Sequence, residues 1–142
     1  MTAHTVTREP ESAQQSSRLT VWGGRALTAL PILIMLASAL MKLNPNPQML
    51  EQFVGRFGYA ESSLLTIAVL ELACVALYAI PQTAVLGAVL MTGYLGGAIA
   101  THVRVGDPGY VAPLLLGISA WAGLFLRDER LRTLLPIRKR RL

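Results

Sequence analysis

A glutamate in the middle of a hydrophobic segment is the residue of this sequence best placed for chemistry. Glu71 lies within residues 64–80, which are otherwise uncharged. A carboxylate in hydrocarbon is costly unless it is paired, protonated or beside water, so such a residue marks a functional site by default. Lys42, His102 and Arg104 stand at or just beyond the ends of neighbouring hydrophobic segments. We therefore take these four residues as candidates for a ligand-binding site.

The candidate residues require helices that cross a membrane to position them. Four hydrophobic segments are present, at residues 26–41, 64–80, 84–100 and 110–126, and each of the last three has 17 residues. A helix of that length spans about 25 Å, the short end of what crosses the hydrocarbon core. The composition is 53% hydrophobic with a mean hydropathy of +0.48, too apolar for an ordinary soluble domain. We predict an all-α fold, a bundle of four transmembrane helices, over a soluble bundle with buried core helices.

The distribution of Lys and Arg predicts the orientation of this bundle. Ten of the thirteen basic residues lie before the first segment or after the fourth, whereas Lys42, Arg56 and Arg104 lie in the two longer connections. Positive residues stay on the cytoplasmic side, so both termini are expected there and the longer connections outside. Lys42, Glu71, His102 and Arg104 then fall in the outer half of the bundle, with Glu71 about 10 Å below the outer boundary.

The remaining parts of the chain flank or connect the four segments. Residues 1–22 are polar and predicted to be a disordered cytoplasmic segment, residues 23–130 the membrane domain, and residues 131–142 a basic cytoplasmic tail. Apolar residues recur at helical spacing over residues 49–57, which predicts a short amphipathic helix between the first two spans. The basic run 138–141 would contact anionic lipid headgroups, and no aromatic interleaving supports a nucleic-acid partner.

Small residues in the last two segments predict close helix packing, within the bundle or between copies. Gly93 and Gly97 form a small-x-x-x-small pair, and Ser119 and Gly123 form another. Cys74 is the only cysteine, so no C-x-x-C redox or metal pattern exists. No haem pair, nucleotide loop or catalytic constellation is recognisable either, and we predict no catalytic residue and no metal site.

Two interpretations of the polar residues remain open. In the structural one, Lys42 and Arg104 anchor helix ends at the interface, and one of them neutralises Glu71. In the functional one, Glu71 forms the floor of a small polar pocket that opens to the outside, and His102 contributes to it. The sequence gives both interpretations similar support.

Four stretches of the sequence together resemble the DoxX-like family. They are residues 39–45 (ALMKLNP), 70–72 (LEL), 92–102 (TGYLGGAIATH) and 126–131 (LRDERL). The glycine-rich run that ends in Ala-Thr-His, with a glutamate in the preceding span, is the most specific part. The resemblance covers most of residues 25–135.

This resemblance implies a small four-helix protein of the bacterial inner (plasma) membrane, with Lys42, Glu71 and His102 at the family's recurrent polar positions. It also implies a redox link, since the founding relative is named for the small subunit of an archaeal thiosulfate:quinone oxidoreductase. The expected function is a membrane subunit or partner-binding module of a redox, quinone-linked system, rather than an enzyme on its own. The alternative is a stand-alone quinone-linked enzyme or small-molecule carrier that uses Glu71.

The cofactor and partner expectations follow the same resemblance. A quinone is implied by the family alone, because no residue pattern of this chain indicates one. The expected partners are the lipid bilayer, a membrane redox protein and further copies of this chain.

Overall fold

Helices make up nearly all of the structure. The computed structural model describes residues 11–128 and 131, with side chains from residue 22 onward. Four long helices form its body: α1 (Glu11–Leu43), α3 (Ser63–Ala79), α4 (Ala84–Arg104) and α5 (Val111–Arg127). Three short segments connect them: α2 (Pro47–Leu50), the π-helical η1 (Glu51–Arg56) and the 3-10 turn η2 (Pro108–Tyr110). The described residues contain no strand, so the predicted all-α class is confirmed.

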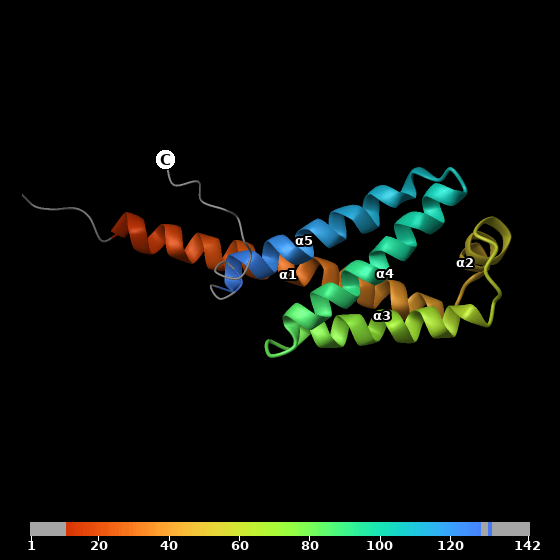
Figure 1. Cartoon of the computed structure of the whole chain (residues 1–142), viewed down its shortest axis with the longest axis horizontal. Coiled ribbons are helices and arrows are strands. Elements are labelled where there is room, and N and C mark those ends of the chain that lie inside the picture. Colours follow the sequence, from red (N-terminus) through yellow and green to blue (C-terminus); the bar gives the residue numbers. More distant parts are fainter. Residues whose placement is uncertain (1–10, 129–130, 132–142) are drawn as a thin grey trace, which may run out of the picture.

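The four long helices pack as two neighbouring hairpins, α1 with α3 and α4 with α5 (Figure 1). α1 packs against both α3 and α5, and α4 packs against the same two helices (Figure 1). α3 and α4 are joined by a tight turn, whereas the longer connection between α1 and α3 contains α2 and η1. Each helix therefore has its neighbours in sequence beside it, as short connections require.

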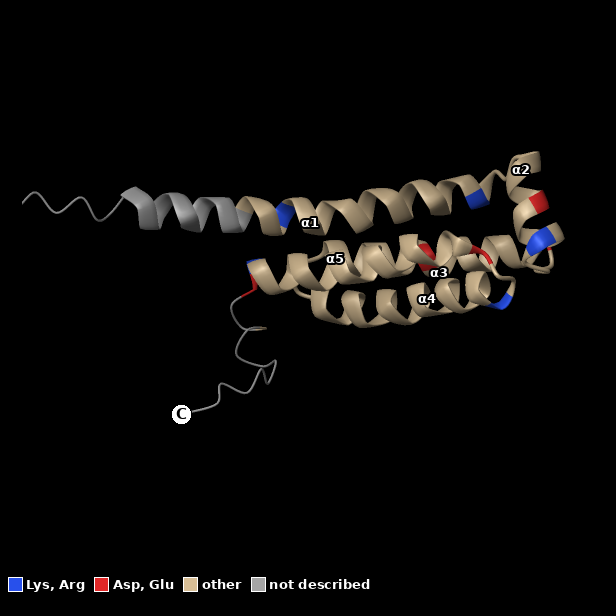
Figure 2. Ribbon diagram, turned by 90° about the horizontal axis from the view of Figure 1, so that it is seen from above, with Lys and Arg blue, Asp and Glu red and all other residues tan. Residues whose placement is uncertain are grey.

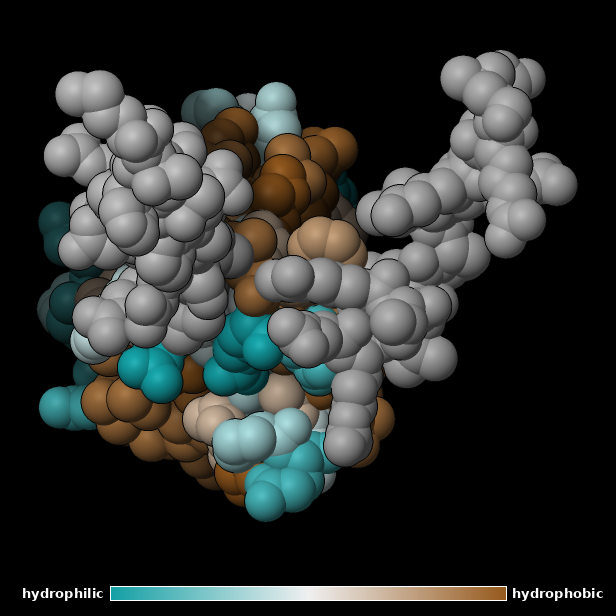
Figure 3. Space-filling model, turned by 90° about the vertical axis from the view of Figure 1, so that its left-hand side faces the viewer, coloured by the Kyte–Doolittle hydropathy of each residue, from teal (hydrophilic) through white to brown (hydrophobic). Residues whose placement is uncertain are grey.

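Three of these helical segments are long and apolar enough to cross a membrane. They are Trp22–Leu43, Ala84–Arg104 and Pro108–Arg127, whereas α3 is apolar but shorter. Large hydrophobic side chains remain exposed along their length, for example Leu33 of α1. Figure 2 shows the charged residues mostly near the two ends of the molecule, and Figure 3 shows hydrophilic residues at one end beside hydrophobic flanks. Such a surface suits lipid better than water.

The first helix begins earlier than the sequence suggests. α1 starts at Glu11, inside the segment 1–22 that we predicted to be disordered. It also contains the buried Pro31, whose missing N–H leaves one backbone carbonyl without its usual partner. Such prolines are tolerated in membrane helices where neighbouring helices surround them. The predicted lipid-binding run 138–141 lies outside the described residues.

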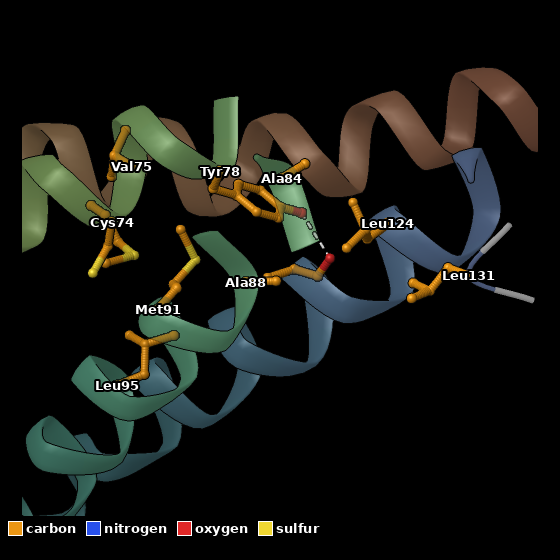
Figure 4. Close-up of a cluster of buried hydrophobic side chains, with 11 residues drawn as sticks. Cys74, Val75, Tyr78, Ala84, Ala88, Met91, Leu95, Leu124 and Leu131 are labelled. Atoms are coloured by element: carbon orange, nitrogen blue, oxygen red, sulfur yellow. Dashed lines mark hydrogen bonds between the residues drawn. The ribbon is translucent and has the colours of Figure 1, made fainter. Parts of the chain in front are cut away.

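The helices approach most closely at the end far from α2. Tyr78 of α3 is fully buried and donates its hydroxyl proton to the backbone carbonyl of Ala120 in α5, at 2.7 Å (Figure 4). A Cβ on Gly87 of α4 would lie 2.3 Å from the Tyr78 backbone nitrogen, so only glycine fits there. A Cβ on Gly123 of α5 would lie 2.8 Å from the Thr28 nitrogen of α1. These two glycines set the spacing of the helices at this closed end.

Toward α2 the helices separate, and the connecting segment spans the opening. Figure 1 shows the tips of α4 and α5 diverging from α1 and α3 near α2. The Arg104 guanidinium at the end of α4 donates a hydrogen bond to the carbonyl of Phe57. The hydroxyls of Tyr59 and Thr101 lie 2.7 Å apart and form a second link. We call residues 46–59 the capping segment.

The capping segment is the short helix that the sequence predicts. Its start is fixed by Asn46, whose side-chain oxygen accepts the Met49 N–H at 2.9 Å, a standard N-cap. Gly58 ends it with a φ of +73°, a conformation that favours glycine. Phe57 is buried and packs edge-to-face on the ring of Phe53, at 5.6 Å between centroids. The apolar side of the segment therefore faces the helices below it.

Candidate functional site

Lys42 and Glu71 form a buried salt bridge. Lys42 lies in the last turn of α1 and Glu71 lies midway along α3. The Lys42 Nζ and Glu71 Oε2 atoms are 2.8 Å apart, and the two side chains are only 5% and 3% exposed. The mutual attraction of such a pair offsets the large penalty for removing both charges from water. Of the two cations proposed as partners of Glu71, the structure selects Lys42.

All three N–H groups of the Lys42 ammonium have acceptors within the protein. One bonds to Glu71, a second to the hydroxyl of Ser38 one turn earlier in α1, and a third to the Ser38 carbonyl at 3.4 Å. An ammonium has three donors and no acceptor. Its nitrogen also lies 5.5 Å from the centroid of the Phe53 ring. Lys42 is therefore fully engaged by its own chain.

A cavity of about 510 Å³ lies beside this pair, in the wedge between the diverging helices. Its wall is largely apolar, with residues from α1, α3, α4, α5 and the capping segment. The polar residues in the wall are Ser38, Lys42, Gln52, Tyr59, Glu71, Tyr94, Thr101 and His102. Sites for small molecules are typically of this size, apolar, with a few convergent polar groups.

His102 and Arg104 lie at the mouth of the wedge rather than beside Glu71. His102 lines the cavity, and its ring packs edge-to-face on Phe57 at 4.9 Å. The imidazole Nδ1 lies 3.1 Å from an Asp107 oxygen, although the pair is poorly aligned for a hydrogen bond. Arg104 does not line the cavity and instead holds the carbonyl of Phe57. The four candidate residues therefore divide into an inner pair and two residues at the mouth.

Asp107 is the charged residue at the mouth that the sequence analysis did not single out. One of its carboxylate oxygens accepts the Gly109 N–H at 3.0 Å, and the other lies 3.5 Å from Arg56 Nη1 in the capping segment. The Gly109 N–H, with smaller contributions from His102 and Arg56, holds the pKa of Asp107 below its ordinary value. The Asp-Pro-Gly turn was visible in the sequence, but its contact with Arg56 arises from the tertiary structure.

Gly93 and Gly97 do not contact another helix of this chain. A Cβ on either glycine would meet nothing within 4 Å, and both line the cavity. Packing of these two glycines against a second copy stays a prediction. Close packing within the chain involves the other predicted pair, because Ser119 is buried and Gly123 meets α1.

Sequence reasoning also missed residues that complete the site. Ser38 stands four residues before Lys42, a spacing that places two side chains on one helix face, and this signal was available. The Tyr94 hydroxyl is a side-chain hydrogen-bond partner of the Glu71 carboxylate, although Tyr94 comes from a different helix. Cys74 is buried in the core, and the described residues contain no cluster of His, Cys, Asp or Glu that could hold a metal ion.

Comparison with known proteins identifies the family. No curated protein and no solved structure matches the chain significantly. The family model described as "DoxX-like family" matches residues 26–123, which include all of α3 and α4 and most of α5. The match covers the salt bridge, the charged residues at the mouth and all the residues that line the cavity. With its long apolar helices, this integral membrane protein belongs to the DoxX-like family.

Proposed function

We propose that the protein is a four-helix bundle that crosses the membrane four times. The shorter helix α3 is then a membrane span in addition to the three longer ones. The 17 residues of α3 extend about 25 Å, and Leu65 and Val69 on its surface are exposed as lipid-facing residues would be. The excess of basic residues near both termini supports a cytoplasmic location for them and an outside location for the capping segment. The family resemblance supports a bacterial inner membrane.

Labelling with a membrane-impermeant maleimide in intact cells tests this topology. The native Cys74 is buried, so the unmodified protein serves as the background control. Gln48→Cys in the capping segment should react in intact cells. Gln82→Cys in the turn between α3 and α4 should react only after the membrane is permeabilised. Reaction of Gln82→Cys in intact cells would contradict the proposed orientation.

The cavity is the observation that supports a function best. We propose that it is a largely apolar pocket in the outer half of the membrane, with a polar group formed by Lys42 and Glu71. It binds a small lipophilic molecule next to these two residues. Its volume and its apolar wall suit such a molecule. Ionisable residues within membranes are expensive and usually functional, which further supports a binding role for the pair.

In this role the protein serves as a membrane subunit or partner-binding module of a redox, quinone-linked system. The redox link rests on the family resemblance. A membrane subunit that binds a lipophilic carrier for a partner enzyme needs a pocket and a docking surface, but no redox centre of its own.

A second candidate function is a stand-alone quinone-linked enzyme or small-molecule carrier that uses Glu71. The observation that favours it is that Glu71, the residue this function requires, lies in the cavity wall beside Lys42.

Purification from native membranes in a mild detergent separates these functions. A subunit should co-purify with an oxidoreductase and with a lipophilic molecule that can be extracted and identified by mass spectrometry. A stand-alone protein should retain the molecule without the partner. Recovery of the protein with neither would contradict both functions.

A further inference from the structure

We infer that the cavity selects neutral lipophilic molecules that carry a hydroxyl, and that this hydroxyl donates a hydrogen bond to the Glu71 carboxylate. The inference rests on the proposed function, since it requires that the cavity bind a lipophilic molecule. It adds the chemical class of that molecule, a phenol or alcohol rather than an ether, ketone or acid.

The first argument is that Lys42 has no donor left for a ligand. Its three N–H groups are directed at Glu71 Oε2, the Ser38 hydroxyl and the Ser38 carbonyl. A ligand that carries only acceptors, such as a carbonyl oxygen, would have to displace one of these bonds. Displacing a bond to a buried ammonium weakens binding, because hydrogen bonds to charged groups are stronger than neutral ones.

The second argument is that Glu71 keeps an acceptor. The Lys42 ammonium bonds to Oε2, and the Tyr94 hydroxyl is a second hydrogen-bond partner of the Glu71 carboxylate. An ionised carboxylate has about four lone-pair sites, so these two donors leave acceptor capacity for a ligand. Glu71 lines the cavity, and a carboxylate can only accept. A ligand hydroxyl is a donor that the remaining acceptor capacity of Glu71 can take, as it takes the Tyr94 hydroxyl.

The third argument concerns charge. The salt bridge brings no net charge to the cavity, and His102 at its mouth faces the carboxylate of Asp107. An anionic ligand would lie against the Glu71 carboxylate with no unpaired cation beside it among the described residues that line the wall. A neutral donor is therefore favoured over an acid. For a quinone couple, this chemistry selects the reduced, dihydroxy form over the oxidised form.

A matched pair of probes tests the donor requirement directly. Equilibrium binding of 4-nonylphenol and of 4-nonylanisole is measured on the full chain in lipid nanodiscs. The two probes have nearly the same shape, and the methyl ether lacks only the donor. We expect the phenol to bind about tenfold more tightly or better, which is the scale of one hydrogen bond to a charged acceptor.

Two variants assign this preference to the salt bridge. The double variant Lys42→Met/Glu71→Met replaces the ion pair with apolar side chains, a change that buried pairs often tolerate. The double variant should bind the phenol and the ether with nearly equal dissociation constants. Ser38→Ala instead leaves the salt bridge intact and frees one N–H of Lys42. This N–H can donate to the ether oxygen, so the ether should bind more tightly. The difference in affinity between phenol and ether should therefore become smaller. Ser38→Ala keeps the test available if the double variant does not fold.

Trp121→Phe is the matched control. Trp121 donates a hydrogen bond to Thr92 and lines a separate groove between α4 and α5. Its substitution should leave the phenol-to-ether ratio unchanged.

The outcomes separate this inference from the proposed function. Equal binding of phenol and ether by the wild type would overturn the donor requirement and leave a lipophile-binding cavity. A preference that persists in the double variant would overturn the assignment to Glu71. If neither probe binds, the proposed cavity function fails, and this inference fails with it.

Discussion

At the scale of single residues, the Lys42–Glu71 salt bridge explains how charge is accommodated inside a largely apolar wall. In one of the two interpretations of the sequence, a cation from the outer half neutralises Glu71, with Lys42 and Arg104 as candidates. Lys42 is the favoured neighbour, but the position of Arg104 depends on where the capping segment lies, which the sequence does not give. In the structure, the Phe57 carbonyl holds Arg104 at the mouth, and only Lys42 reaches the carboxylate.

Removing one partner of this pair should be worse than removing both. Glu71→Gln leaves the Lys42 ammonium buried without a counter-charge, and we expect a loss of about 3–5 kcal/mol in the free energy of unfolding. Lys42→Met/Glu71→Met should recover most of this loss, because no charge remains buried. Reversible denaturation in detergent micelles measures all three proteins. A Glu71→Gln protein as stable as wild type would show that the salt bridge does not hold the two helices together.

At the scale of helices, glycine positions distinguish the closed end from the open end. The predicted pair of Gly93 and Gly97 and the tightly packed Gly87 all belong to α4. A small-x-x-x-small motif indicates that another helix can approach the backbone closely, but it does not indicate which neighbouring helix does so. That depends on how two hairpins diverge, which is a property of the whole fold and not of the motif.

Alanine substitutions test this assignment. Gly87→Ala would place a methyl group against the Tyr78 backbone, and we expect a clear fall in the thermal unfolding temperature. Gly93→Ala enters open space in the same helix, so its stability should be unchanged or raised by up to about 1 kcal/mol through the better helix propensity of alanine. Equal effects of the two substitutions would argue against the observed spacing of α3 and α4.

The contact between the capping segment and the α4–α5 connection provides a second test at this scale. Asp107→Asn removes the carboxylate that faces Arg56 and His102, so amide hydrogen exchange in residues 47–57 should become faster. Glu61→Gln, at an exposed residue of the nearby turn, is the control and should leave exchange unchanged. Unaltered exchange in Asp107→Asn would mean that other contacts hold the capping segment in place.

The pH dependence of this contact has a definite sign. The pKa of Asp107 is below its ordinary value of 3.8, so the folded state favours the carboxylate. Its contribution to stability is present above pH 3.8 and is lost as the pH falls through the lower pKa of the folded state. We therefore expect exchange in the capping segment to be insensitive to Asp107 between pH 5 and 7. A titration of Asp107 within that range, followed by NMR, would contradict this.

At the scale of the whole molecule, hydropathy and helical spacing predicted most of the architecture. Each of the four hydrophobic segments lies largely within one long helix, and residues 47–56 form the predicted short connection. Two features could not be predicted. The extension of α1 to Glu11 runs through polar sequence, and the divergence of the hairpins depends on contacts among residues far apart in the chain. The cavity follows from that divergence, so the sequence could suggest its polar residues but not its size or its apolar wall.

The central claim is that the wedge between the hairpins binds a lipophilic molecule, and two neighbouring glycines test it most directly. Gly97 lines the cavity and Gly96 lines the separate groove between α4 and α5, and both have open space around them. The measurement is the amount of 4-nonylphenol bound per protein for Gly97→Leu and Gly96→Leu, with oligomer size as a check. The account predicts that Gly97→Leu fills the cavity and loses at least about tenfold in affinity, a change of about 1.4 kcal/mol, while Gly96→Leu binds like wild type. Equal binding by the two variants, with unchanged oligomer size, would contradict it.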